Sequence, residues 1–353
     1  MNKLFSFLLS LVFISIAHAQ IRIVNYNIAK LQGDQAALKE VLALASEDDS
    51  CGEALSVSIF VFQEVSQGNQ KELHQLLGDT YSMGTYTNQG EPGGAQAMFY
   101  ESTQLIEKVA SHEDIFTGAG RYADRWELHG VGENKGVHLW MYSTHLKASK
   151  GSSNKDQRLI GANAILENIK TLPEDANVIV VGDMNFYTNK ELAYQAFIEI
   201  LIDPLGTEEW AGEDDAIKHT QSPRKVRKGG LIHGGLDDRF DFQFISKSLQ
   251  DGKGLDIIVG SYHAFGNDGK HYDEAINEQG KPYFKDNEEL ANALHSASDH
   301  IPVIADYEIK KKKVATIVVT SINIQSVPKL FNQVKKTDSM IALKSILANS
   351  SFL

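Results

Sequence analysis

Short apolar segments that end in acids, amides or histidines recur along this chain, and this pattern constrains the fold more than any other feature. Residues 57–62 lead directly to Gln63 and Glu64, and residues 178–181 lead to Asp183. Short apolar runs bounded by turn signals are typical of buried strands. Polar groups at strand ends let a rigid sheet present converging side chains to one cleft. The pattern therefore predicts a sheet protein with a functional site at its strand ends.

The rest of the chain alternates between strand-like and helix-like patterns. Apolar residues at helical spacing occur at residues 35–45 and 156–169. Strand patterns occur at residues 21–27, 57–62, 95–100, 126–131, 137–144, 178–181, 240–245, 256–261 and 302–309. This mixture predicts one domain over residues 20–309, with two packed sheets and helices outside them. Two polar segments, residues 223–235 and 262–298, interrupt the pattern and are expected to be long loops.

The first 19 residues have the layout of a cleavable export signal. Lys3 precedes an almost wholly apolar run at residues 4–17, and Ala17-His18-Ala19 resembles a cleavage site before Gln20. We therefore expect a secreted or periplasmic protein with a signal peptide at residues 1–19. No other segment approaches the roughly 20 apolar residues that cross a bilayer, so stable membrane insertion is not expected. Residues 310–353 form a C-terminal tail of unknown role.

Cysteine content and charge limit the classes of function. Cys51 is the only cysteine, so no internal disulfide can form. We expect it to be an ordinary loop residue rather than a reactive thiol. No Cys/His cluster suggests zinc, and oxygen ligands dominate instead. The formal charge of −12 disfavours loose electrostatic binding to nucleic acid or anionic membranes. It does not exclude a nuclease, whose bound cations neutralise phosphates.

Several strand ends carry groups that can hold a cation. Asn27 and Glu64 end the first two predicted strands. A carboxylate at a sheet rim is costly to desolvate unless it is paired, and Mg²⁺ or Ca²⁺ prefers such oxygen ligands. Taken singly, Glu64 is better explained by a salt bridge and Asn27 by a turn cap. Asp183 and Asn185 stand two apart after a glycine, so both can face one ligand, with an Asx turn as the alternative.

Two of the 12 histidines stand where acid–base chemistry is expected. His145 closes the strand pattern at residues 137–144. His300 follows Asp299 and precedes the last strand pattern. A histidine oriented by a carboxylate can act as a general base near neutral pH. Asp241 alternates with two phenylalanines, so its side chain faces away from their rings. An acid within such an apolar strand indicates a functional role.

Taken together, these short polar motifs, or boxes, resemble those of the endonuclease/exonuclease/phosphatase superfamily. They are specific for the superfamily but not for the substrate, and they cover about residues 21–309 in the family's order. The resemblance implies an α/β fold, a four-layer α-β-β-α sandwich of two mixed sheets flanked by helices. It also implies metal-dependent hydrolysis of a phosphate ester. The matching boxes are Asn25-Tyr26-Asn27, Gln63-Glu64-Val65, Thr144-His145-Leu146-Lys147, Gly182-Asp183-Met184-Asn185, Asp238-Arg239-Phe240-Asp241 and Ser298-Asp299-His300.

The resemblance implies a cation and a base. Asn27 and Glu64 would bind the divalent ion, Mg²⁺ or else Mn²⁺ or Ca²⁺, with Asp299 nearby. His300, oriented by Asp241, would deprotonate the attacking water or stabilise the phosphoryl group. Phosphoryl chemistry needs charge neutralisation and alignment more than covalent help, which agrees with such a set.

The remaining boxes would act on the phosphate itself. Asp183 and Asn185 would position the nucleophile and the crowded transition state. His145 would donate to a non-bridging oxygen. Members of the family also carry a mid-chain tyrosine or arginine that touches phosphate. In this chain three residues before the strand pattern at 126–131 could take that role, and Arg125 is preferred because it is nearest to the strand. The three are Arg121, Tyr122 and Arg125.

The substrate is the least determined part. The leading hypothesis is a nuclease or general phosphodiesterase that acts as a monomer. The basic run at residues 224–228 is then a candidate loop for contacting successive phosphates. A solvated run of charges is an equally good interpretation of these residues. Residues 236–241 lack the Pro, Trp and Cys of the inositol 5-phosphatase box. Secreted sphingomyelinases commonly have an aromatic-rich hairpin that enters the membrane. The aromatic residues in 262–298 are instead scattered among charged residues, which argues against membrane insertion. A sphingomyelinase- or phosphoinositide-type phosphoesterase is the alternative. A non-catalytic binding protein is disfavoured because every box is retained.

Overall fold

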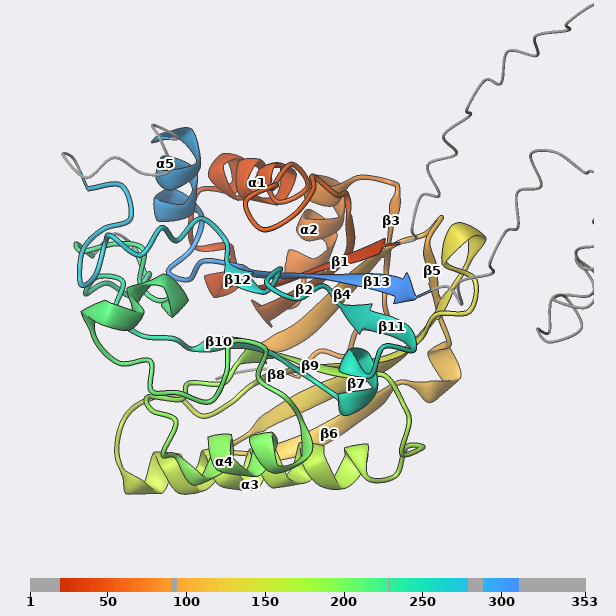
Figure 1. Cartoon of the computed structure of the whole chain (residues 1–353). Helices are drawn as coiled ribbons and strands as arrows, with labels where there is room; N and C mark the ends of the chain where they lie inside the picture. The colour runs from red at the N-terminus through yellow and green to blue at the C-terminus, as the bar shows by residue number, and fades with distance from the viewer. Residues whose placement is uncertain (1–19, 90–93, 228, 279–287, 311–353) are drawn as a thin grey trace, which may run out of the picture. The chain divides into compact units, whose positions relative to one another are not determined.

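The structure, a computed structural model, describes residues 20–89, 94–227, 229–278 and 288–310 (Figure 1). These residues belong to one compact unit that ends at Lys310. The predicted signal peptide and the tail from residue 311 lie outside the described residues. Within the part described, no helix combines the length and apolarity that crossing a membrane requires.

The first sheet contains the N-terminal and C-terminal strands of the domain side by side. β1 and β2 run parallel, whereas the other neighbours are antiparallel. Both faces of these strands are buried, which explains their near-continuous apolar sequence. Across the sheet the order is β11 (Gly254–Ile257), β13 (Val303–Lys310), β1 (Gln20–Asn27), β2 (Val57–Val65), β4 (Ala95–Glu101) and β3 (Tyr81–Met83), with β12 (His263–Ala264) also paired to β13.

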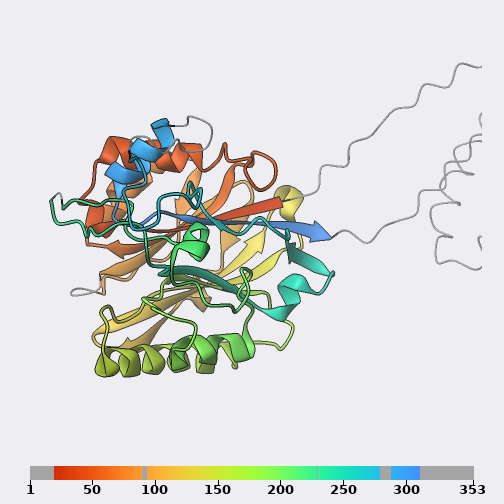
Figure 2. The same cartoon turned by 60° about the vertical axis from the view of Figure 1, so that its left-hand side comes forward.

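The second sheet is built from the middle of the chain. Here β8 and β9 form the parallel pair. The other described pairings in this sheet are antiparallel. Figure 2 shows the two sheets facing each other across the centre of the domain. The order is β10 (Asp241–Ile245), β9 (Val178–Asp183), β8 (His138–His145), β7 (Arg121–Gly130) and β5 (Leu105–Glu107), with β6 (Glu113–Gly118) also paired to β7.

Helices cover the outer face of each sheet, so the predicted four-layer α-β-β-α sandwich is confirmed (Figure 1). α1 (Gln35–Leu44), α2 (Asn69–Leu77) and α5 (Glu288–Ala297) lie on the first sheet. α3 (Ser152–Ile169) and α4 (Leu192–Ile200) lie on the second. Short 3-10 turns occur at Ala29–Leu31, Val109–Ser111, Gly132–Asn134, Glu213–Lys218 and Lys247–Gln250.

Two apolar clusters hold these layers together. The larger one joins the inner faces of the two sheets to α1 and α5. The smaller one lies between the second sheet and α3 and α4, where the Phe242 and Phe244 rings stack with centroids 5.1 Å apart. Phe244 in turn stacks on Phe197 of α4 at 5.0 Å. Burial of such rings stabilises the fold by roughly 1.5–3 kcal/mol each.

The structure corrects the sequence prediction at the segment 262–298. It was expected to be a long loop, but it contains β12 and α5. The spacing of Leu290, Leu294 and Ala297, all buried, gives α5 one apolar face. The polar residues that precede this helix in the sequence make the helical spacing of its apolar residues hard to recognise. The helices α2 and α4 and the short strands β3, β5 and β6 were also not predicted.

The parallel pairs determine where the site lies. Asn27 is paired with Gln63 at the carboxyl ends of β1 and β2. His145 is paired with Asp183 at the carboxyl ends of β8 and β9, and Asp183 is also paired with Asp241 at the start of β10. The two sheets therefore bring their polar strand ends to one edge of the sandwich.

Candidate active site

Asn27 connects the two sheets at this edge. Its Nδ2 atom donates to Oε1 of Glu64 at 3.2 Å, on the neighbouring strand, and to Oδ2 of Asp183 at 3.0 Å, on the opposite sheet. Its Oδ1 atom accepts from the backbone N–H of Ala29 at 3.0 Å. The amide thus holds two carboxylates close together.

Asp183 is the centre of the cluster. The Asn185 amide donates to its Oδ1 at 2.8 Å. Its Oδ2 lies 3.4 Å from Nε2 of His145 and 3.6 Å from Nε2 of His300. Burial raises the pKa of Asp183 to about 7, an effect that the charge of His300 opposes and the neighbouring carboxylates reinforce. This carboxyl group therefore holds a proton more readily than an ordinary aspartate does.

His300 is held between two acids. Its Nδ1 atom lies 2.7 Å from Oδ2 of Asp241. Its Nε2 atom faces Asp183 and lies 2.6 Å from the side-chain amide of Gln221. Burial lowers the pKa of His300, but the charges of Asp241 and Asp183 outweigh burial and raise the pKa to about 10.

Gln221 is a contact that the sequence did not predict. It forms backbone bridges with both Asp238 and His300, which brings its side chain onto the imidazole. Gln221 lies in an irregular polar segment, with no apolar run before it. No local pattern marks such a residue, because its position depends on the pairing of two distant segments.

Glu64 and Asn185 both adopt backbone angles that are unusual for residues with a side chain. Their φ values are +57° and +52°, in the left-handed region. Strain of this kind is typical of functional sites, where the surrounding structure enforces it. Burial raises the pKa of Glu64, and the charge of Asp299 acts in the same direction. Asp299 is itself fixed by the backbone N–H of Ile232, 2.7 Å from its Oδ2.

The residues present fit a divalent cation. Glu64 and Asp183 are two largely buried carboxylates whose ionised forms are disfavoured, and the Asn27 amide hydrogen-bonds both. Oxygen donors of this kind suit Mg²⁺, Mn²⁺ or Ca²⁺. A bound cation would relieve the repulsion between the carboxylates, which a hydrogen-bonding amide does only in part.

Arg125 does not join this cluster. Its guanidinium donates to Asn168 of α3 at 2.9 Å, pairs with Glu113 at 2.9 Å and lies 5.0 Å from the ring of Trp140. These contacts lie on the α3 side of the second sheet, so the preference for Arg125 as a phosphate contact is not supported. Nearness to a strand does not decide which face a side chain takes.

Arg121 is the arginine that reaches the site from β7. Its Nη1 atom donates to the carbonyl oxygens of His145, at 2.9 Å, and of Leu146. Burial lowers its pKa, whereas the charges of Asp183 and Glu64 raise it. Arg121 thus supports the backbone that carries His145 and adds positive charge behind the carboxylates.

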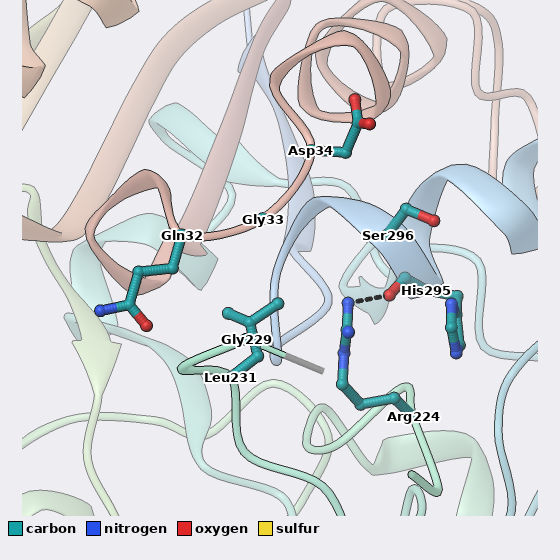
Figure 3. A pocket seen from close by; sticks show the side chains of 8 residues that line it. All are labelled: Gln32, Gly33, Asp34, Arg224, Gly229, Leu231, His295 and Ser296. Atoms are coloured by element: carbon teal, nitrogen blue, oxygen red, sulfur yellow. Dashed lines mark hydrogen bonds between the residues drawn. The ribbon is translucent and has the colours of Figure 1, made fainter. Parts of the chain in front are cut away.

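In the described part of the basic run, residues 224–227, Arg224 is buried and the other three residues are exposed. Arg224 is 1 % exposed and donates to the carbonyl oxygens of His295 and Ser298, so it caps the end of α5. Figure 3 shows its guanidinium pointing to His295 across a pocket of about 400 Å³, also lined by Gln32, Asp34 and Leu231. The structure therefore gives Arg224 a structural contact rather than a position for tracking phosphate.

Comparisons with known proteins find structural likeness alone. No protein-family model and no curated protein sequence matches the chain. Among solved structures, D. rerio TDP2 with a single-strand DNA product is 16 % identical, covers 82 % of this chain and 99 % of its own, and has a TM-score of 0.54. A Bacteroides thetaiotaomicron mannosyl-6-phosphatase is 15 % identical, covering 81 % and 99 %, with a TM-score of 0.53. The human Nocturnin catalytic domain is 16 % identical, covering 82 % and 94 %, with a TM-score of 0.51.

These similarities extend to proteins described as endonuclease/exonuclease/phosphatase family members from Bacteroides thetaiotaomicron and Bacteroides vulgatus. The fold implied by the sequence boxes is thus the fold that is observed. At such low identity the likeness concerns the architecture, and the chemistry must be argued from the side chains at the sheet edge.

Proposed function

We propose that this chain is a secreted, divalent-metal-dependent phosphoesterase that hydrolyses phosphodiester bonds, with nucleic acid as the leading substrate class. One observation carries the proposal: three acids, two of them buried, an amide and two histidines from both sheets meet at one edge of the sandwich. The fold is shared with a phosphatase and with a protein crystallised with a DNA product, which supports phosphoester chemistry.

The cation would bind at the carboxylate side of the cluster. Glu64 and Asn27 would hold it, with Asp299 nearby. A bound divalent ion would neutralise phosphate charge and polarise a phosphoryl oxygen. Glu64 is suited to this because it keeps 24 % of its side chain exposed while its neighbours are buried. It can therefore contact both the ion and an incoming substrate.

His300 would handle the proton of the attacking water. Asp241 hydrogen-bonds Nδ1, so a neutral His300 carries its acceptor lone pair on Nε2. Nε2 faces Asp183, whose negative charge favours the imidazolium. The base is therefore active only when the negative charge around it is compensated. Asp183, whose pKa is raised by burial, would hold the water by a hydrogen bond.

Two further groups would act on the phosphate. The Asn185 amide is fixed by Asp183 and by the carbonyl oxygen of Leu146 at 3.3 Å. His145 lies between Asp183 and Glu64, at 3.4 and 3.8 Å from their oxygens. Donors held in advance near a developing charge cost no reorganisation during the reaction, and each contributes about 10²–10³ in rate.

Positive charge beside the site supports an anionic substrate. Lys30 is close enough for its charge to lower the pKa of Glu64, and Lys150 has a similar effect on Asp238. The Lys150 ammonium lies 4.9 Å from the centre of the Tyr187 ring. Local cations of this kind can attract phosphate to a protein whose overall charge is negative.

A substrate panel tests the proposal. The purified protein would be incubated with single-stranded DNA, plasmid DNA, RNA and bis-p-nitrophenyl phosphate, with Mg²⁺, Mn²⁺ or a chelator, beside His300→Ala as a matched inactive control. We expect cleavage of at least one diester that requires the cation and is lost in the variant. Cleavage of sphingomyelin or a phosphoinositide instead would retain the phosphoesterase and refute the nuclease. No cation-dependent hydrolysis of any phosphoester would refute the proposal.

Export is tested separately. Residues 1–19 lie outside the described residues, and Gln20 is the first residue of β1. Cleavage before Gln20 would leave the whole strand intact. N-terminal sequencing of protein recovered from the medium or periplasm should therefore begin at Gln20, and an uncleaved intracellular product would contradict export.

A further inference from the structure

A second group of metal-ligating side chains lies on β7 and β8, far from the candidate active site. Glu127, His129 and His138 place their ligand atoms within 4.8 Å of one another. His129 and His138 are directly paired across the two strands. His138 stands seven positions before His145 on β8, which is roughly 23 Å along a strand. The group therefore belongs to the opposite end of the second sheet.

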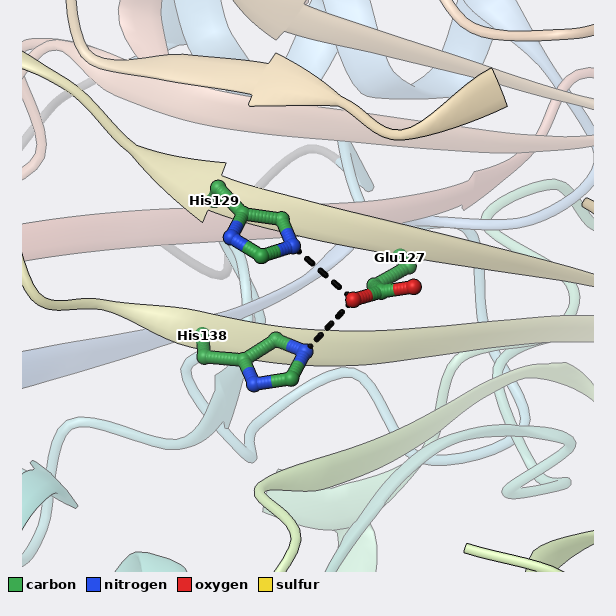
Figure 4. A group of neighbouring side chains, drawn as sticks. All are labelled: Glu127, His129 and His138. Carbon is green, nitrogen blue, oxygen red and sulfur yellow. Dashed lines mark hydrogen bonds and ion pairs between the residues drawn. The ribbon is translucent and has the colours of Figure 1, made fainter. Parts of the chain in front are cut away.

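The two imidazoles converge on one oxygen. Nε2 of His129 lies 2.8 Å from Oε1 of Glu127, and Nε2 of His138 lies 2.9 Å from the same atom (Figure 4). Ligands at about 2.0–2.2 Å from a tetrahedral metal are separated from each other by about 3.3 Å. Small side-chain rotations would thus convert these hydrogen bonds into two Nε2 ligands and one carboxylate ligand.

The surroundings of these three side chains favour a bound cation over hydrogen bonds among the side chains alone. The two rings stack with centroids 4.6 Å apart and planes at 24°, so their Nε2 atoms lie side by side (Figure 4). Their side chains are 44 and 48 % exposed, so an ion can enter and water can complete its coordination. The Glu127 side chain is only 4 % exposed, and the Lys108 ammonium lies 3.1 Å from its Oε2 and also donates to its Oε1 at 3.4 Å. This ion pair orients the carboxylate, whose Oε1 also contacts both histidines.

We propose that Glu127, His129 and His138 form a binding site for a borderline transition-metal ion such as Zn²⁺, Cu²⁺ or Ni²⁺. Two imidazoles and one carboxylate on rigid, adjacent strands suit these ions, whereas Mg²⁺ and Ca²⁺ prefer oxygen ligands alone. The site differs from the oxygen-rich cluster at the other end of the sheets. The two sites therefore discriminate between classes of metal.

Metal titration of the intact protein tests this site. Zn²⁺ binding would be measured by calorimetry in the presence of millimolar Mg²⁺, which competes at oxygen-only sites. We expect His129→Asn and His138→Asn each to raise the dissociation constant of one Zn²⁺ at least about tenfold. His233→Asn, which removes another exposed histidine, is the matched control and should leave that dissociation constant unchanged.

A spectroscopic measurement identifies the ligands. One equivalent of Cu²⁺ should give an electron paramagnetic resonance spectrum with coupling to two imidazole nitrogens, and this coupling should fall to one nitrogen in His138→Asn. Circular dichroism would establish that each variant remains folded. Equal Zn²⁺ affinity in the wild type and in the folded His129→Asn/His138→Asn double variant would overturn the proposal. So would a Cu²⁺ spectrum that the two substitutions leave unchanged.

Discussion

The Nδ1 atom of His300 lies 2.7 Å from Oδ2 of Asp241, although the two residues are 59 positions apart in the chain. Asp241 begins β10, and His300 precedes β13 of the opposite sheet. This contact therefore forms only when both sheets are packed. It also assigns the proton of a neutral imidazole to Nδ1 and leaves Nε2 directed at Asp183.

Replacement of Asp241 by Asn should lower the turnover number by about 10²–10⁴. The amide removes the charge that stabilises the imidazolium and can donate to Nδ1, which would place the proton on Nε2. Steady-state kinetics with bis-p-nitrophenyl phosphate would measure the loss. Because the side chain keeps its size, the Michaelis constant should change much less. A turnover number within a few-fold of the wild type would remove Asp241 from the proposed mechanism.

Glu64→Gln should separate cation binding from folding. Loss of one carboxylate ligand should raise the Mg²⁺ concentration for half-maximal activity at least about tenfold. Burial raises the pKa of Glu64, so its ionised form disfavours the metal-free fold at pH 7. The free energy of unfolding without metal should thus be unchanged or higher in the variant.

Mg²⁺ titration of the activity and urea unfolding in a chelator would measure these two effects. An unchanged Mg²⁺ requirement would contradict the role of Glu64 as a ligand. A large loss of stability in the chelator would instead indicate a structural ion pair at this position.

Most of the residues that meet at this edge could be singled out from the sequence because the relevant information is local. Asn27, His145 and Asp183 are the last residues of their strands, and Glu64 is the last residue but one of β2. Parallel pairing brings the ends of β1 and β2 together in one sheet and those of β8 and β9 together in the other, and packing of the two sheets joins the two pairs. The same rule places Asp241 there, since it begins the strand antiparallel to β9.

The remaining contacts depend on tertiary structure and leave no local pattern. Gln221 reaches His300 through a bridge between two irregular segments. Arg121 and Arg125 stand four apart on the same strand, yet one supports the site and the other faces α3. The residues that surround a long side chain on a twisted strand decide its direction. The sequence does not show which residues these are.

The buried ion pair between Arg22 and Asp306 should be a major contributor to stability. Arg22 is 1 % exposed and contacts the two carboxylate oxygens at 2.7 and 2.8 Å, joining β1 to β13. Asp306→Asn would leave a buried cation without a counter-charge and should lower the free energy of unfolding by about 3–5 kcal/mol. Urea unfolding would measure it. The exposed pair of Lys170 and Glu167 is the control, and Lys170→Ala should cost less than about 1 kcal/mol.

The contact between Asp48 and His263 should make stability depend on pH. Their closest atoms are 3.0 Å apart. Burial lowers the pKa of His263, but hydrogen bonds to Asp48 and Cys51 outweigh burial and raise the pKa to about 10. A raised histidine pKa stabilises the fold fully below the unfolded value of about 6.5, and this contribution is lost as the pH rises toward 10. The difference in unfolding free energy between the wild type and His263→Gln should therefore shrink from pH 6 to pH 10, and a constant difference would contradict the ion pair.

The thiol of Cys51 should be more reactive than that of an ordinary surface cysteine. We expected an unremarkable loop residue, and Cys51 is exposed as such a residue would be. However, a hydrogen bond to His263 lowers the pKa of the thiol, although burial and the charge of Asp48 oppose this. The thiolate is the nucleophile, so a lower pKa raises its fraction at neutral pH.

Because Cys51 is the only cysteine, a disulfide reagent reports on it alone. At pH 7 the reaction should slow several-fold in His263→Gln, and the pH midpoint of the rate should move upward. Equal rates in the two proteins across this pH range would show that His263 does not activate the thiol.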